Sequence, residues 1–115
     1  MSVLLPNEGA WLVANWVSRG FFEDCRPHLD RYPAFAEDIR FCLDADVDTL
    51  DARRRGPEDV AALYRLVLDV IDDNRRKGSV AFGQPEMFPV YLSKLEQLAE
   101  TLKASVHESP SRGVT

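Results

Sequence analysis

The clearest pattern of hydrophobic positions along the chain predicts a long central helix over residues 57–77. Pro57 and two acids occupy its first turn, three consecutive cations (75–77) its last, and Gly78 follows as a cap. These ends favour a helix, because its amino end is partly positive and its carboxyl end partly negative. Apolar residues recur at steps of three and four. The predicted inward face comprises Val60, Leu63, Tyr64, Val67, Val70 and Ile71, broadened by Leu66 and Leu68.

Two further helices follow from the same periodicity, one beginning at Pro33 and the other at Pro89. The apolar side of the first comprises Phe35, Ile39 and Cys42 or Leu43. That of the second comprises Tyr91, Leu92, Leu95, Leu98, Ala99, Leu102 and Val106. We therefore expect a single helical domain over residues 1–106, followed by a flexible tail over 107–115.

Weaker signals predict the remaining helices. Asn7 is placed to cap a first helix that ends or bends at Gly20. Its apolar stripe comprises Trp11, Leu12, Val13, Trp16 and Val17. A short helix over 47–54 is favoured by early acids and late arginines. Residues 80–82 resemble a strand, but three residues make no sheet. The predicted fold is all-α, a compact bundle of four to five helices.

The loop before the last helix, residues 79–88, is unusually apolar for a connection. Gly83 and Pro85 exclude regular structure there. Its apolar side chains are Val80, Phe82, Met87 and Phe88. They either fold back and close the bundle, which is the commoner outcome, or form a patch that docks another protein.

Composition and charge narrow the class of function. The 115 residues are 45% hydrophobic and carry a formal net charge of −5. An acidic chain has no general affinity for nucleic acid or anionic membranes, because both are polyanions. The first eight residues show no secretory signal, and no apolar run approaches the roughly 20 residues of a membrane span. We therefore expect a cytoplasmic protein.

The aspartates at 44, 46 and 48 occupy the first, third and fifth positions of a calcium-loop pattern. Such a loop needs glycine at its sixth position and a bidentate glutamate at its twelfth. Here Thr49 and Arg55 stand at those positions. The pattern is better explained as an acidic connector that caps the next helix, and no metal is expected.

Cys25 and His28 are three residues apart and would share a helix face, but Pro27 disturbs that geometry. Catalysis by a cysteine also needs an oxyanion hole and an orienting group, for which the sequence offers no candidate. We expect Cys25 and Cys42 to be buried reduced thiols, and His28 to lie on the surface beside a half-buried Cys25. His107 is too distant to complete a metal site. No nucleotide-binding or hydrolase motif is present, so neither a cofactor nor an enzymatic activity is expected.

Two basic clusters, residues 53–55 and 75–77, fall at the carboxyl ends of predicted helices. Cations stabilise that end, so these clusters need no nucleic acid to explain them.

The sequence favours a small acidic domain that binds a protein partner, with inhibition of a basic protein as one form of this activity. Bacterial immunity proteins and antitoxins are often this small and acidic, a comparison of class and size without matched residues. The candidate partner-binding residues are Asp44, Asp46, Asp48, Asp51, Phe82, Met87 and Phe88. Two alternatives stay open: a small-ligand protein or enzyme with a pocket between helices, and a structural protein that forms homodimers through residues 82–88.

Overall fold

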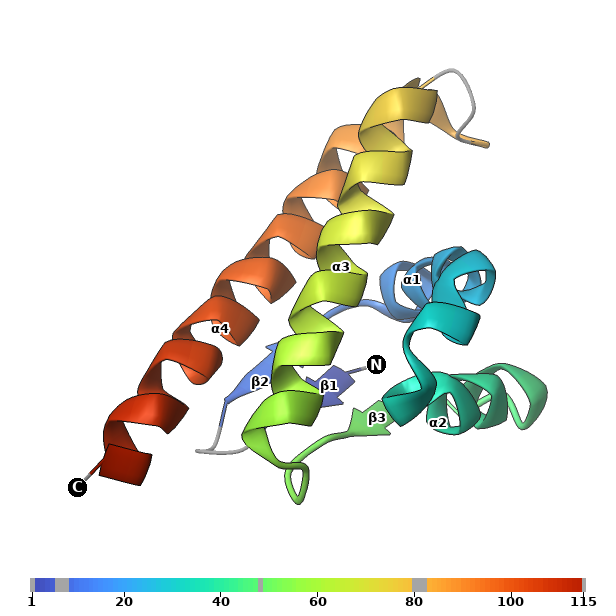
Figure 1. The fold of residues 1–115 in the computed structure, drawn as a ribbon. Coiled ribbons are helices and arrows are strands. Elements are labelled where there is room, and N and C mark those ends of the chain that lie inside the picture. The colour runs from blue at the N-terminus through green and yellow to red at the C-terminus, as the bar shows by residue number, and fades with distance from the viewer. Residues whose placement is uncertain (1, 6–8, 48, 80–82, 115) are drawn as a thin grey trace.

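The computed structural model describes residues 2–5, 9–47, 49–79 and 83–114, without the side chains of Ser2 and 106–114. The described elements are, in order, β1 (Ser2–Leu4), β2 (Ala10–Leu12), α1 (Asn15–Cys25), the 3₁₀ helix η2 (Arg26–Arg31), α2 (Pro33–Asp44), β3 (Thr49–Asp51), α3 (Pro57–Lys77), the 3₁₀ helix η4 (Pro85–Met87) and α4 (Phe88–Val114). The long helices α3 and α4 run antiparallel, with the small sheet and the shorter helices α1 and α2 beside them (Figure 1).

The predicted central helix is confirmed. α3 spans Pro57–Lys77, and Gly78 follows with φ of 71°, a left-handed conformation that glycine adopts without strain. Every residue of the predicted inward face is buried or half-buried. Leu66 is buried as well, whereas Leu68 is exposed, so one side of α3 faces solvent.

The helix expected from Pro33 is also confirmed, as α2, with its predicted apolar side buried. The last helix begins at Phe88, one residue before the predicted Pro89. α4 continues to Val114, past residue 106, and the predicted flexibility of residues 107–115 stays a prediction.

The all-α prediction is wrong in one respect, because the helices pack on a three-stranded sheet of order β2-β1-β3. β1 pairs antiparallel with β2 and parallel with β3, and Trp11, Val3 and Leu50 align across the sheet. These three side chains are buried, whereas Leu12 is 73% exposed. This two-residue alternation is the pattern of a strand with one covered face.

Two predicted helical segments are therefore wrong. Trp11 and Leu12 belong to β2, and the first helix begins only at Asn15; Asn7, its predicted cap, lies outside the described residues. The segment 47–54 contains β3 instead of a short helix. In both segments, pairing with β1 outweighs a weak local preference for helix.

Gly20 does not end the first helix, because α1 continues to Cys25. A Cβ atom at Gly20 would lie 3.2 Å from Cε1 of Tyr91, so the glycine allows α1 to approach α4 closely. The Trp11 indole donates a hydrogen bond from Nε1 to the Lys94 carbonyl oxygen at 2.8 Å. This bond attaches the sheet to α4. No helix in the described ranges is long and apolar enough to cross a membrane.

Candidate functional site

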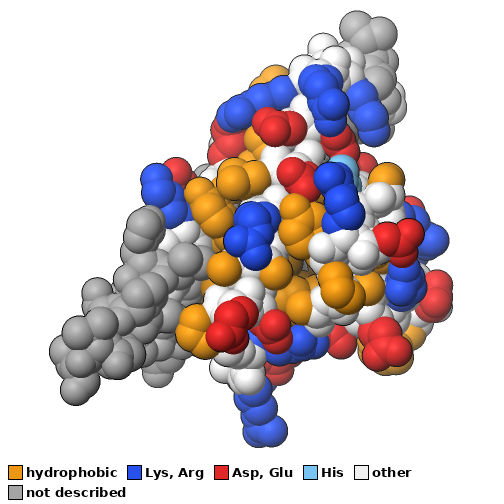
Figure 2. Space-filling model, in the orientation of Figure 1, with side chains coloured by type: hydrophobic (Ala, Val, Ile, Leu, Met, Phe, Trp, Pro, Cys, Tyr) orange, Lys and Arg blue, Asp and Glu red, His pale blue; other side chains and the backbone are white. Residues whose placement is uncertain are grey.

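A polar cleft of about 630 Å³ lies between η2 and α3. We call it the His28 cleft; its lining residues are His28, Arg31, Asp69, Asp72, Asp73, Arg75 and Arg76. Figure 2 shows acidic and basic side chains gathered around a small exposed area in the histidine colour. The expectation of a surface histidine is wrong, since His28 is only 7% exposed. The aspartates that bury it come from α3, 41 to 45 residues further along the chain.

Both ring nitrogens of His28 are already engaged. Arg31 Nη2 donates to Nδ1 at 2.8 Å, so Nδ1 accepts and Nε2 carries the proton that faces Asp73 Oδ2 at 2.5 Å. Burial alone would raise the pKa of Asp73, but the hydrogen bond from His28 and the charge and hydrogen bond of Arg76 outweigh it and lower that pKa. Both nitrogens are thus bonded to side chains of the protein itself. The His28–Asp73 hydrogen bond joins η2 to α3, and we call this connection the clasp.

Cys25, next to this clasp, is not suited to nucleophilic chemistry. It is completely buried rather than half-buried as expected, and burial followed by the nearby Asp24 charge raises the pKa of its thiol. A raised pKa disfavours the reactive thiolate. Cys42 is a buried thiol as well, as the sequence predicts, and donates from Sγ to the Thr49 carbonyl oxygen.

A second polar network joins three helices in the interior. Asp24 Oδ2 accepts hydrogen bonds from the Tyr91 hydroxyl at 2.6 Å and from Asn74 Nδ2 at 3.0 Å. Burial, and then the Asp24 charge, raise the pKa of Tyr91, so its hydroxyl remains a donor. This network links α1, α3 and α4 and holds them in register.

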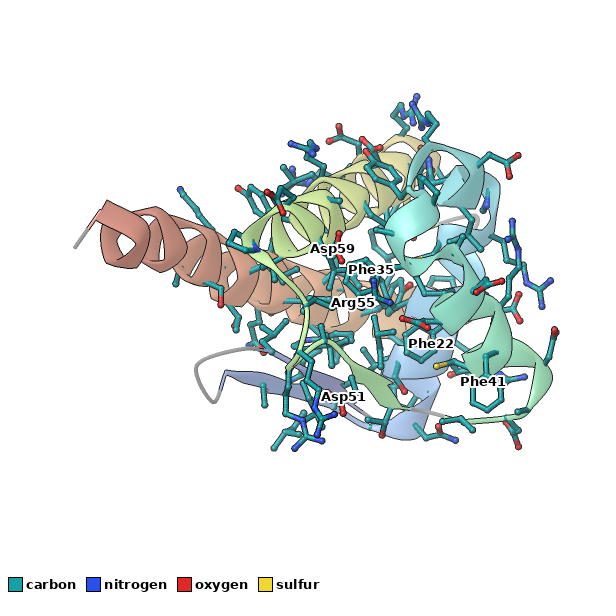
Figure 3. The ribbon with its side chains drawn as sticks, turned by 60° about the horizontal axis from the view of Figure 1, so that its bottom comes forward. Phe22, Phe35, Phe41, Asp51, Arg55 and Asp59 are labelled. Carbon is teal, nitrogen blue, oxygen red and sulfur yellow. The ribbon has the colours of Figure 1, made fainter. Side chains whose placement is uncertain are left out.

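The basic cluster 53–55 does not end a helix, contrary to the prediction, since it follows strand β3. Arg55 instead reaches inward (Figure 3). Its Nη1 donates to the Ala34 carbonyl oxygen at 2.8 Å and to Asp59 at 3.1 Å, and its Nη2 donates to Asp38. The guanidinium carbon lies 4.6 Å from the centre of the Phe35 ring. The Arg55 guanidinium thus stacks on an aromatic ring and bonds to two carboxylates at the same time. The cluster 75–77 does end α3, as predicted.

The predicted acidic residues lie around the end of α2 and on β3. Asp44, Asp46 and Asp51 are exposed, and Asp48 lies outside the described residues. Asp46 has φ of 58° and contacts Arg19 at 2.7 Å, so it serves the turn that ends α2. Hydrogen bonds from the side chain and the backbone of Arg53 lower the pKa of Asp51 to about 2. Of these acids, Asp44 is the one without an ion pair within the described part of the chain.

The predicted apolar residues lie elsewhere. Phe82 is outside the described residues, and Met87 and Phe88 are half-buried where η4 meets α4. Met87, Trp16, Gly83 and Gln84 line a mainly apolar hollow of about 370 Å³, which we call the Trp16 hollow. Trp16 is 41% exposed, although the sequence placed it in the apolar stripe of the first helix.

Phe41 is an exposed aromatic residue that sequence reasoning missed. It is 61% exposed on the outer side of α2 and points away from the core (Figure 3). Phe41 is an aromatic residue on the polar face of α2, outside the buried apolar stripe. The sequence pattern alone could therefore have indicated that it is exposed. Together with Asp38, Cys42, Thr49, Leu50 and Asp51 it lines a small groove of about 190 Å³ between α2 and β3.

Acids surround Phe41 on the helix surface. Its neighbours three and four residues away are Glu37, Asp38, Asp44 and Ala45, and Asp51 lies across the groove. Asp38 pairs with Arg55, whereas Glu37 and Asp44 form no ion pair among the residues that the structure describes. We call the set Glu37, Phe41, Asp44 and Asp51 the Phe41 surface.

Comparisons of the chain with protein-family models, curated proteins and solved structures found no match. Over the described ranges, no group of three or more His, Cys, Asp or Glu side chains is placed to hold a metal ion.

Proposed function

We propose that this chain is a small acidic protein-binding domain, and that its Phe41 surface docks a basic segment of a protein partner. The observation that carries the proposal is an aromatic ring, 61% exposed, flanked along its helix by carboxylates without an ion pair of their own in the described part of the chain. Aromatic side chains are enriched at protein interfaces, and they anchor a complex by burying a large area.

The two kinds of side chain would have separate tasks. The carboxylates of Glu37 and Asp44 speed the encounter with a positively charged partner, and this contribution weakens as salt is added. The Phe41 ring slows dissociation, because leaving the complex exposes it to water again. The net charge of −5 adds to the long-range attraction. Inhibition of a basic protein, as by immunity proteins and antitoxins, is one activity that such a surface would serve.

The test compares two double variants with the same change in net charge. Glu37→Gln with Asp44→Asn alters the Phe41 surface, while Glu86→Gln with Glu100→Gln alters exposed acids on η4 and α4. Immobilised wild-type protein and both variants are used to capture partners from cells of the source organism, at low and high salt. We expect a specific basic protein on the wild-type and control columns, and much less on the Glu37/Asp44 column. Equal capture by both variants would contradict the proposal.

The Trp16 hollow favours a second candidate function, the binding of a small apolar ligand. Its volume lies within the usual range for ligand pockets, and Trp16 gives it an aromatic wall. Titration with anilinonaphthalene sulfonate, whose aromatic rings bind apolar sites and then fluoresce more strongly, tests this candidate. Saturable binding that Trp16→Ala abolishes and Phe41→Ala preserves would support it; binding unaffected by Trp16→Ala would contradict it.

A further inference from the structure

One partly buried arginine of the protein is already bound to an aromatic ring and carboxylates. Arg55 lies over Phe35 at 4.6 Å and donates hydrogen bonds to Asp38 and Asp59. The planar guanidinium covers the ring while its edge bonds to the carboxylates. Phe35 is completely buried, so its ring is not accessible to other molecules.

The outer side of α2 also carries an aromatic ring and two carboxylates, but no cation is bound to them among the described residues. Phe41 supplies the ring, and Glu37 and Asp44 supply carboxylates one turn before and one turn after it. These two positions lie about 10 Å apart along the helix, so both acids can reach a group centred on Phe41. Within the described residues, no cationic group lies over the Phe41 ring.

The arginines next to the Phe41 surface are paired with carboxylates other than Glu37 and Asp44. Arg40 contacts Asp30 at 3.6 Å, and Arg53 contacts Asp51, within the surface itself, at 2.8 Å. Arg55 lies over Phe35. The Phe41 ring, Glu37 and Asp44 are therefore available to a cation from another molecule.

We propose that the Phe41 surface recognises an arginine side chain of the partner, stacked on the Phe41 ring and hydrogen-bonded to Glu37 or Asp44. The inference rests on the proposed function and adds the identity of the bound side chain. Arginine fits better than lysine because its guanidinium is planar, weakly hydrated and able to stack and donate at once. A lysine ammonium is a compact, strongly hydrated charge that would use the acids more than the ring.

The experiment uses two short acetylated and amidated peptides, one with two arginines separated by a glycine and one with two lysines in the same places. Each is titrated into the isotopically labelled full chain, and amide shifts of residues 37–51 are followed by NMR. We expect the arginine peptide to bind more tightly than the lysine peptide. Phe41→Leu, which keeps an apolar side chain but removes the ring, should weaken arginine binding by about twofold to fivefold and abolish the preference.

The outcomes separate the inference from the proposed function. Equal affinity for both peptides, or an arginine preference that survives Phe41→Leu, overturns the inference. If Glu37→Gln with Asp44→Asn then still weakens both peptides, binding of a basic partner at this surface stands. If neither peptide shifts residues 37–51, arginine recognition is refuted, and the capture experiment decides the proposed function separately. Because Phe41 is largely exposed, misfolding of the leucine variant is not expected and is checked by its amide spectrum.

Discussion

The His28 cleft and the Phe41 surface both contain ring and carboxylate side chains. They differ in how many of these side chains are already bonded to other groups of the protein. In the cleft, Asp73 binds His28 and Arg76, and Tyr32 donates to Asp69 at 2.6 Å. On the Phe41 surface, a ring and two acids keep their capacity for binding. A concentration of ionisable groups is therefore a poor indicator of a binding site. Exposed side chains that have no bonding partner among the described residues are a better indicator.

The largest expected effect comes from the cleft. His28→Ala should lower the free energy of unfolding by about 2–3 kcal/mol, because it opens space in a buried clasp and leaves Asp73 and Arg31 with fewer partners. Urea unfolding followed by circular dichroism measures this. Asp72→Ala is the matched control, since Asp72 lines the same cleft but is exposed. A similar loss in both variants would show that His28 is not the centre of the clasp.

The cleft should also make the protein sensitive to acid. The pKa of Asp73 is lowered in the folded state, so the unfolded chain takes up this proton first as pH falls. The stabilisation is complete above the ordinary aspartate pKa near 4 and is lost as pH drops through the lower folded value. Asp73→Asn should flatten the pH dependence of unfolding below pH 5. An unchanged pH profile in this variant would contradict the assignment.

A smaller loss of stability is expected where Arg55 lies on the Phe35 ring. Arg55→Lys should cost about 1–2 kcal/mol, because an ammonium cannot stack on Phe35 and bond to Asp38, Asp59 and Ala34 at once. Arg54→Lys, at an exposed position next to it, should change stability by less than about 0.5 kcal/mol. Thermal melts of the two variants make the comparison. Equal melting temperatures would show that the contact of Arg55 with Phe35 adds no stability. The binding of an arginine to Phe41 would then lose the support of this comparison.

The smallest effect on folding is expected at the Phe41 surface. Phe41→Ser should change the free energy of unfolding by less than about 0.5 kcal/mol, because the ring is mostly in water already. Chemical denaturation measures this. A loss comparable with that of His28→Ala would mean that Phe41 belongs to the core and is not available to a partner.

The parts of the fold that the sequence predicted are those determined by local pattern. α3 shows helical periodicity, capping residues and a cap glycine within one continuous segment, and its bounds agree with the prediction. The sheet was missed because each strand has three residues, and β3 pairs with a strand more than 40 residues earlier. No local pattern reveals such a pairing.

The same distinction applies to the candidate sites. The burial of His28 depends on Asp73, 45 residues away, which no spacing rule connects to it. The exposed position of Asp44 could be predicted from its place at the end of a helix, but the pairing of Asp46 with Arg19 could not. Phe41 could have been found, since it interrupts the polar face of a helix whose buried side was correctly identified.

The measurement that tests the account most directly is an amide-shift map of the wild-type chain titrated with the arginine peptide. It reports in one experiment which of the two regions responds to a cation. We predict saturable shifts in residues 37–44 and 49–51, and constant positions for His28 and residues 69–76. Shifts centred on the His28 cleft, or no saturable shift in residues 37–51, would contradict the claim that the Phe41 surface binds an arginine side chain.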